Sequence, residues 1–202
     1  MRGLLAALYL LWAGMVHAED YPALYDVRGV AADDVLNVRA GPGVGHPVIG
    51  ALLPGASGIE VVSASADGRW LMLNADETAG WASAFYLQRT GPIWSFGLPT
   101  PLACFGTEPF WSLERTGAQA MFSDMGFERI TLSEVWSGQA SARGTDQFGA
   151  VWEGAGRRIT ATLRREACSD GMSERMFGLS TLVIIQTPDG VQMLSGCCAL
   201  AP

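Results

Sequence analysis

The chain has 202 residues, of which 49% are hydrophobic and 16% are charged. This length and composition exclude a disordered chain and allow one medium domain or two small ones, with a buried core. The formal net charge is -7, and an acidic surface repels phosphate backbones, so no nucleic-acid partner is expected.

The N-terminal residues 1–18 have the pattern of a signal peptide. Arg2 precedes a short apolar run, and Val16 and Ala18 stand at the small-residue positions before a cleavage site. The run is shorter than the roughly twenty residues that a membrane-spanning helix needs. We therefore predict cleavage after Ala18, with an uncleaved anchor as the alternative. The mature protein is then periplasmic or secreted, with no membrane anchor.

The glycine-rich stretch over residues 36–50, LNVRAGPGVGHPVIG, raises the question of a phosphate-binding loop. Such a loop needs a helix directly after its glycines, because the helix N-terminus binds the anion. Here the glycines are followed by His46, Pro47 and a β-branched run that soon ends at Pro54. The sequence therefore predicts a sharp corner that leads into a strand, and no cofactor.

Short strand-like runs separated by Gly, Pro, Asp or Asn fill the first module, residues 21–89. They cover residues 34–39, 47–54, 58–65, 69–74 and 80–87. So many short strands in so little sequence predict a small, highly bent barrel.

The order of these elements resembles the bacterial SH3 domain over residues 35–87. The resemblance is carried by LNVR, GPG, VIG, a glycine at position 55, GRW, and GWA before YL. It implies core positions for Trp70 and Trp81 and no catalytic machinery in this module. It also implies attachment to peptidoglycan or another bacterial cell-envelope component. Asn37 and Arg39 are candidate ligand-binding residues, although they could instead brace the first loop.

Residues 90–103 form the predicted linker between two modules. They contain three prolines and two glycines and show no periodicity. We expect this linker to pack in part through Trp94 and Phe96. The second module then covers residues 104–200.

The second module also consists of strand-like runs. They cover residues 110–116, 118–124, 128–136, 146–154, 157–166, 180–190 and 191–198. Ile159, Ala161 and Leu163 alternate with polar residues, which is typical of a strand with one buried face. Short turns between runs predict antiparallel hairpins, and closure would remove exposed edges. The fold class is therefore all-β, an SH3-like barrel followed by a larger antiparallel barrel or sandwich stapled by disulfides.

All four cysteines lie in the second module, at Cys104, Cys168, Cys197 and Cys198. Export makes disulfides the expected state, and no C-x-x-C pair suggests a metal site. A closed barrel pairs its first strand with its last, which brings Cys104 beside the Cys197–Cys198 pair. Since neighbouring strand residues face opposite sides, we predict that Cys104 and Cys168 each bond one member of that pair. Which bonds which is left open.

Two stretches, residues 104–111 and 168–177, do not look like plain strands. They resemble a family of exported bacterial proteins marked by the motifs GTEPFW and CSDGMS, and this resemblance implies no particular activity. The candidate ligand-binding residues of these motifs are Glu108, Trp111, Asp170 and Arg175. As structural alternatives, Asp170 and Gly171 form a turn, Asp170 or Ser169 could cap a short helix before Arg175, and Glu108 could pair with Arg175.

The second module has no histidine to serve as the base for a nucleophile, so we predict no catalytic residues. The protein is expected to bind an envelope component through its first module and an unidentified ligand or partner through its second. One alternative is a peptidoglycan-directed glycoside hydrolase that uses Glu108 and Asp170. Another is a lysozyme-type inhibitor, which the barrel resembles in size, although the chain lacks the lysine that such inhibitors usually employ.

Overall fold

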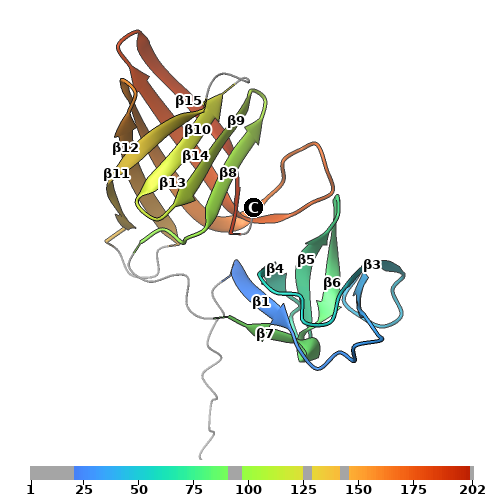
Figure 1. Ribbon diagram of the computed structural model, residues 1–202. Helices are drawn as coiled ribbons and strands as arrows, with labels where there is room; N and C mark the ends of the chain where they lie inside the picture. The colour runs from blue at the N-terminus through green and yellow to red at the C-terminus, as the bar shows by residue number, and fades with distance from the viewer. Residues whose placement is uncertain (1–20, 91–96, 125–128, 142–145, 201–202) are drawn as a thin grey trace, which may run out of the picture.

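The computed structural model describes residues 21–90, 97–124, 129–141 and 146–200 (Figure 1). Almost all regular structure in these ranges is β-strand, arranged in two separate antiparallel sheets. This confirms the all-β fold class. The predicted signal peptide and the linker residues Trp94 and Phe96 lie outside the described ranges.

The first sheet has seven strands in the order β3-β2-β6-β5-β4-β1-β7. They are β1 (Ala23–Val27), β2 (Leu36–Arg39), β3 (Val48–Leu52), β4 (Ile59–Ala64), β5 (Trp70–Ala75), β6 (Thr78–Ser83) and β7 (Leu87–Arg89). Alternating aliphatic residues, such as Leu71 and Leu73 of β5, form its buried core. β1 and β7 were not expected as strands, and the run expected to continue to Leu87 is interrupted by the 3-10 turn Ala84–Tyr86.

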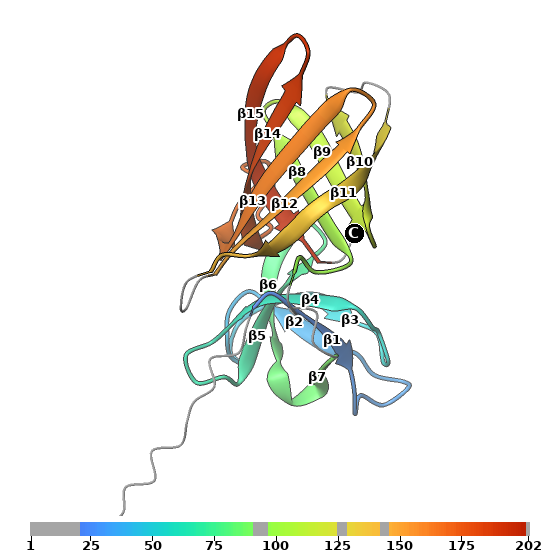
Figure 2. The same cartoon turned by 90° about the vertical axis from the view of Figure 1, so that its left-hand side faces the viewer.

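The second sheet is a closed antiparallel barrel of eight strands, which decides between a barrel and a sandwich (Figure 2). Its strands are β8 (Leu102–Thr107), β9 (Phe110–Thr116), β10 (Gln119–Asp124), β11 (Ile130–Gln139), β12 (Gln147–Gly154), β13 (Arg157–Cys168), β14 (Phe177–Thr187) and β15 (Gly190–Ala199). Strands that follow one another pair with each other, and β15 returns to β8.

The interior of the barrel is a packed hydrophobic core. Trp111, Phe122 and Trp152 are each at most 4% exposed and belong to one buried cluster. Ile159 and Leu163 of β13 point into the same cluster, as the alternation of that strand predicts. Because large side chains occupy the interior, ligands have to be sought on the outside of the barrel.

β8 is a strand that the sequence did not reveal. Residues 104–107 were interpreted as part of an irregular stretch, but they pair with β9 on one side and β15 on the other. Leu102 and Cys104 point into the barrel core and are at most 2% exposed. The nearby prolines and Gly106 hid this alternation. The barrel therefore begins at Leu102, two residues before the predicted module boundary.

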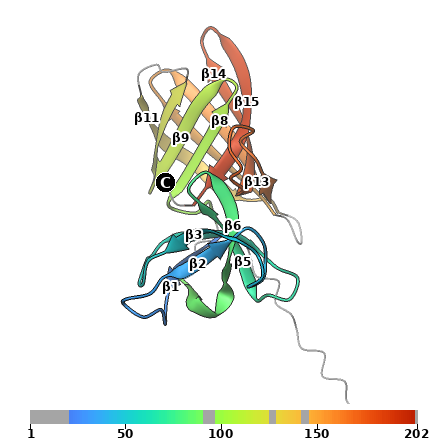
Figure 3. The ribbon, with the colours of Figure 1, turned by 90° about the vertical axis from the view of Figure 1, so that its right-hand side faces the viewer.

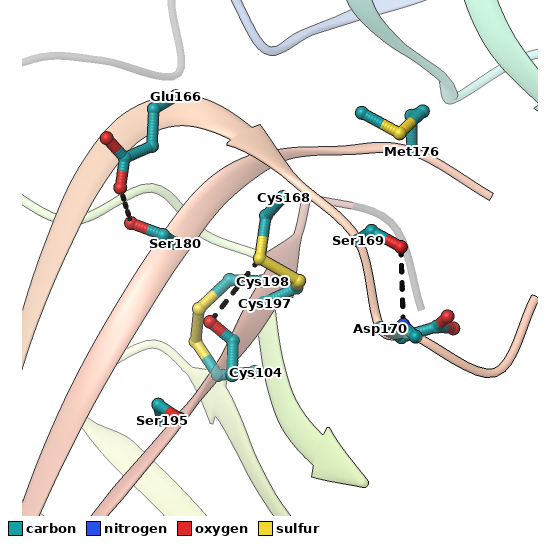
Figure 4. Close-up of a disulfide and its surroundings, with 12 residues drawn as sticks. Cys104, Glu166, Cys168, Ser169, Asp170, Met176, Ser180, Ser195, Cys197 and Cys198 are labelled. Atoms are coloured by element: carbon teal, nitrogen blue, oxygen red, sulfur yellow. Dashed lines mark hydrogen bonds between the residues drawn. A yellow bond between two sulfur atoms is a disulfide. The ribbon is translucent and has the colours of Figure 1, made fainter. Parts of the chain in front are cut away.

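Two disulfides join the cysteines, as expected from barrel closure (Figure 4). Cys104 of β8 bonds Cys198 of β15, its direct partner in the strand register, and both side chains lie in the barrel core. Cys168 bonds Cys197, which faces the outside of the barrel and packs beside Phe177. Cys197 and Cys198, which are neighbours on β15, thus form their disulfides on opposite faces of the sheet.

The loop over residues 169–176, between β13 and β14, contacts the β5–β6 hairpin of the first sheet (Figure 3). Glu174 pairs with this hairpin through two backbone hydrogen bonds. Its amide donates to the carbonyl of Glu77 at 3.0 Å, and its carbonyl accepts from the amide of Ala79 at 2.9 Å. The Asn74 side chain donates to the Met176 carbonyl at 2.9 Å and accepts from the Met176 amide at 3.0 Å. The two sheets are therefore joined by a second contact, distant in sequence from residues 90–103.

Candidate functional site

The glycine-rich stretch forms the corner between β2 and β3. β3 follows it directly, so the expected strand is confirmed and no helix N-terminus is present to bind an anion. Arg39 donates a hydrogen bond of 2.9 Å to the carbonyl of His46, and the His46 ring lies against Gly41. A Cβ atom at Gly41 would come within 2.6 Å of that ring, so only glycine fits there.

A groove of about 450 Å³ lies beside this corner on the first sheet. Its lining includes Asn37 and Arg39, the two residues that the SH3 resemblance singled out. Trp70 and Tyr86 contribute aromatic surface, and Val44 belongs to the corner itself. The structure thus brings both predicted residues of the first module into one concave site. Arg39 also braces the loop, because its guanidinium donates the hydrogen bond to the His46 carbonyl.

Trp70 was expected in the core, and the structure corrects that expectation. Trp70 and Trp81 are both only half-buried, and neither belongs to the buried cluster of the first sheet. The reason is strand alternation: Leu71 and Leu73 take the inward positions of β5, which turns Trp70 away from the core. Trp70 and Tyr86 are therefore the lining residues that sequence reasoning missed.

The lining of this groove suits a ligand with both apolar and polar parts. Trp70 and Tyr86 offer ring faces, and Asn37 offers an amide that can donate and accept. The Arg39 guanidinium can bind a carboxylate, and its hydrogen bond to His46 holds it in place. Asp34, also in the lining, adds an acceptor of opposite charge.

The two motifs of the second module meet at a smaller pocket of about 290 Å³. Glu108 follows β8, Asp170 belongs to the loop after β13, and both line this pocket. Thr107 ties the segments together, since its hydroxyl donates a 2.9 Å hydrogen bond to the Asp170 carbonyl. The structure therefore brings Glu108 and Asp170 together, although they are far apart in sequence.

The carboxylate of Asp170 is engaged within its own loop. Its Oδ1 accepts hydrogen bonds from the amides of Met172 and Ser173, at 3.0 and 2.9 Å, and the Ser173 hydroxyl also donates to it. Burial raises the pKa of Asp170, but these hydrogen bonds and the charge of Arg175 outweigh burial and lower the pKa overall. Asp170 is thus a poor general acid at neutral pH.

Among the structural alternatives for these motifs, the turn at Asp170–Gly171 is present, whereas the helix cap and the Glu108–Arg175 pair are wrong. The Asp170 bonds close a turn, and no helix follows in the residues that the structure describes up to β14. Arg175 lies 5.2 Å from the centre of the Phe177 ring, and the ion pairs among described residues do not join it to Glu108. Arg175 does not line the pocket.

Trp111 was expected to contact ligand, and its position corrects this expectation. Its side chain is 4% exposed, and its indole N–H donates to the carbonyl of Ser195 at 3.2 Å. The ring also stacks near Phe122, with 6.5 Å between the ring centres. Trp111 therefore fills the barrel core and cannot reach a surface ligand.

Two further findings bear on the site. Among the described residues, no three His, Cys, Asp or Glu side chains gather as ligands for a metal ion. Within the same ranges, no helix is long and apolar enough to span a membrane. Comparison with known proteins adds no relative: no protein-family model, no curated protein and no solved structure matches the chain.

Proposed function

We propose that the protein is an exported binding protein of the bacterial cell envelope that attaches to peptidoglycan through its first module. The observation that supports this function best is the groove that unites Asn37 and Arg39 with Trp70 and Tyr86. The resemblance of residues 35–87 to the bacterial SH3 domain supports it independently, and the predicted export signal and the disulfides agree with it.

The chemistry of peptidoglycan matches this groove. Its stem peptides carry carboxylates and amides, which Arg39 and Asn37 can bind. Their aliphatic parts can pack on the ring faces of Trp70 and Tyr86. Because the chain is acidic overall, we expect weak attachment that depends on these local contacts and not on general charge attraction.

Co-sedimentation of the mature chain with purified sacculi tests this function. Trp70→Ala is expected to lower binding about tenfold, because one of two aromatic walls is lost. Trp81→Ala is the matched control, since Trp81 is also half-buried on the same sheet but lies outside the groove lining. Both variants are checked by thermal unfolding. Equal binding by wild type and a folded Trp70→Ala variant would refute the groove as the attachment site.

The turbidity of the same sacculus suspension separates binding from hydrolysis. The proposed function predicts binding without clearing. Clearing that disappears in Glu108→Gln would instead establish the glycoside hydrolase, and protection of sacculi against added lysozyme would favour the inhibitor. Because the pKa of Asp170 is lowered, a hydrolase at this pocket would have to use Glu108 as the general acid and Asp170 as the ionised carboxylate.

A further inference from the structure

A further groove lies on the outer face of the barrel and shares only Ser195 and Gly196 with the pocket of Glu108 and Asp170. It has a volume of about 740 Å³ and crosses the strands from β11 to β15. Figure 2 shows β11, β12 and β13 of this face toward the viewer. Trp136 on β11 and Leu182 on β14 contribute exposed bulky apolar side chains, and Arg164 and Glu166 on β13 contribute charge. A groove of this size can hold a small ligand.

Trp136 packs against two glycines at this groove. Its side chain is 54% exposed, although it is the largest apolar side chain on β11. The ring lies against Gly138 and Gly149, which are direct partners in the register of β11 and β12. A Cβ at these positions would come within 2.9 and 3.2 Å of the ring. The indole therefore packs on the paired glycines and leaves much of its surface exposed to solvent.

The floor of the groove consists of small side chains. One cross-strand row on the outer face runs from Gly138 through Gly149, Thr162 and Leu182 to Ser195. Only Leu182 in this row is a large side chain, and it is 48% exposed. The row therefore forms a shallow channel with the exposed indole beside it.

Polar groups stand beyond the far side of the row. Arg164 and Glu166 form an ion pair with 3.6 Å between nitrogen and oxygen, and the Ser180 hydroxyl donates to Glu166 (Figure 4 shows the last contact). Gln147, which pairs with Arg164 in the register, adds an amide. Because the two charges neutralise one another, this rim favours a polar ligand without net charge.

We propose that this groove binds an uncharged glycan of N-acetylated amino sugars. A sugar ring has an apolar face of C–H bonds that packs on the Trp136 indole, while its hydroxyls bond the polar rim. The acetamido methyl group packs beside Leu182 on the floor of small side chains, and the acetamido N–H and C=O find partners among Ser180, Ser195 and Gln147. The site is independent of the first-module groove and gives the second barrel a ligand of its own.

Calorimetric titration of the mature chain with the soluble tetrasaccharide of N-acetylglucosamine tests this proposal. Wild type is expected to bind, and Trp136→Ala is expected to lose at least about tenfold in affinity. Val135→Ala is the matched control, because Val135 lies in the same bulge and is also 54% exposed but does not line the groove. Trp70→Ala should bind the tetrasaccharide normally, so failure here is distinguishable from failure of the first-module groove.

A second variant guards against simple loss of fold. Gly138→Ala places a methyl group where the indole rests, so it should displace Trp136 and weaken binding while the other groove residues stay unchanged. Cellotetraose, which lacks acetamido groups, should bind at least about tenfold more weakly. The proposal is overturned if wild type does not bind, if folded Trp136→Ala binds as wild type does, or if cellotetraose binds equally well.

Discussion

Arg115 and Glu134 form an ion pair of 2.8 Å at one end of the barrel core, with side chains only 10% and 15% exposed. Arg115 also donates to the carbonyls of Leu98 and Pro99, each at 3.1 Å, and so binds the segment that leads into β8. Burial raises the pKa of Glu134, but the hydrogen bonds from Arg115 and Ser137 and the charge of Arg115 outweigh burial, so the pKa is lowered.

This lowered pKa predicts that acid weakens the barrel through Glu134. Since the folded-state pKa lies below the unfolded value of about 4.3, ionised Glu134 stabilises the fold above that pH. The contribution disappears as the pH falls through the folded-state value. Glu134→Gln should therefore cost about 1–3 kcal/mol at pH 7 and flatten the acid limb of stability against pH. Urea unfolding between pH 3 and 7 measures both effects, and an unchanged acid limb would contradict the prediction.

Two tryptophans show how far single residues could be predicted from the sequence. The unusual motif of Trp111 predicts a ligand contact and the family position of Trp70 predicts a core residue, but Trp111 lies in the barrel core and Trp70 lines a groove outside the core of the first sheet. Strand alternation explains both positions. Trp111 lies on the same, buried face of β9 as Leu113, whereas Trp70 lies on the face of β5 opposite to the buried Leu71. Glu108 and Asp170 line one pocket, and the turn predicted at Asp170–Gly171 is present, but the helix predicted as an alternative does not follow it in the described residues up to β14.

Among the strands, the long alternating ones were predictable and those beside prolines were not. β13 and β14 show clear periodicity, and their pairing follows from hairpin topology. β8 is masked by Pro99 and Pro101, and its inward position 106 is a glycine that carries no hydrophobic signal. The Trp136 groove was missed because paired glycines on different strands become visible only once the register is known.

The two disulfides close loops of different length, so we predict that they contribute differently to the free energy of unfolding. The Cys104–Cys198 bond spans 94 residues and joins the first barrel strand to the last, whereas Cys168–Cys197 spans 29. In the chain-entropy model, replacing Cys104 and Cys198 together by Ser costs about 4–5 kcal/mol, and replacing Cys168 and Cys197 costs about 3–4 kcal/mol. Urea unfolding of the two double variants measures this, and the reverse order would contradict it.

At the scale of the whole molecule, the loop over residues 169–176 links the two sheets. Apart from its backbone pairing with the β5–β6 hairpin, the main specific contact is the double hydrogen bond between Asn74 and Met176. Pro22 also lies against Gly178, where a Cβ would come within 2.8 Å of its ring. The motif CSDGMS thus has a structural role, because it shapes a loop that holds the barrel to the first sheet.

Asn74→Ala removes both side-chain hydrogen bonds at this contact. We expect a loss of about 1–3 kcal/mol in the free energy of unfolding, since each net hydrogen bond contributes about 0.5–1.5 kcal/mol. Limited proteolysis should also cut the loop near Met176 faster. The matched control is Asn37→Ala, which truncates the chain's other asparagine at an exposed position of β2. If both variants have the same stability and cleavage rate, the contact does not join the sheets.

The barrel is joined to itself where its first and last strands meet, with Ala103 opposite Ala199 and a disulfide one position away. Topologically, the eight strands form a ring whose covalent order has an arbitrary starting point. In a barrel released from the first module ahead of Leu102, a short peptide connecting these two ends would close the same ring, and the chain could then be opened at the turn between β14 and β15 without changing any strand pairing. In such a circular permutant the backbone itself would replace the tether that Cys104 and Cys198 now provide.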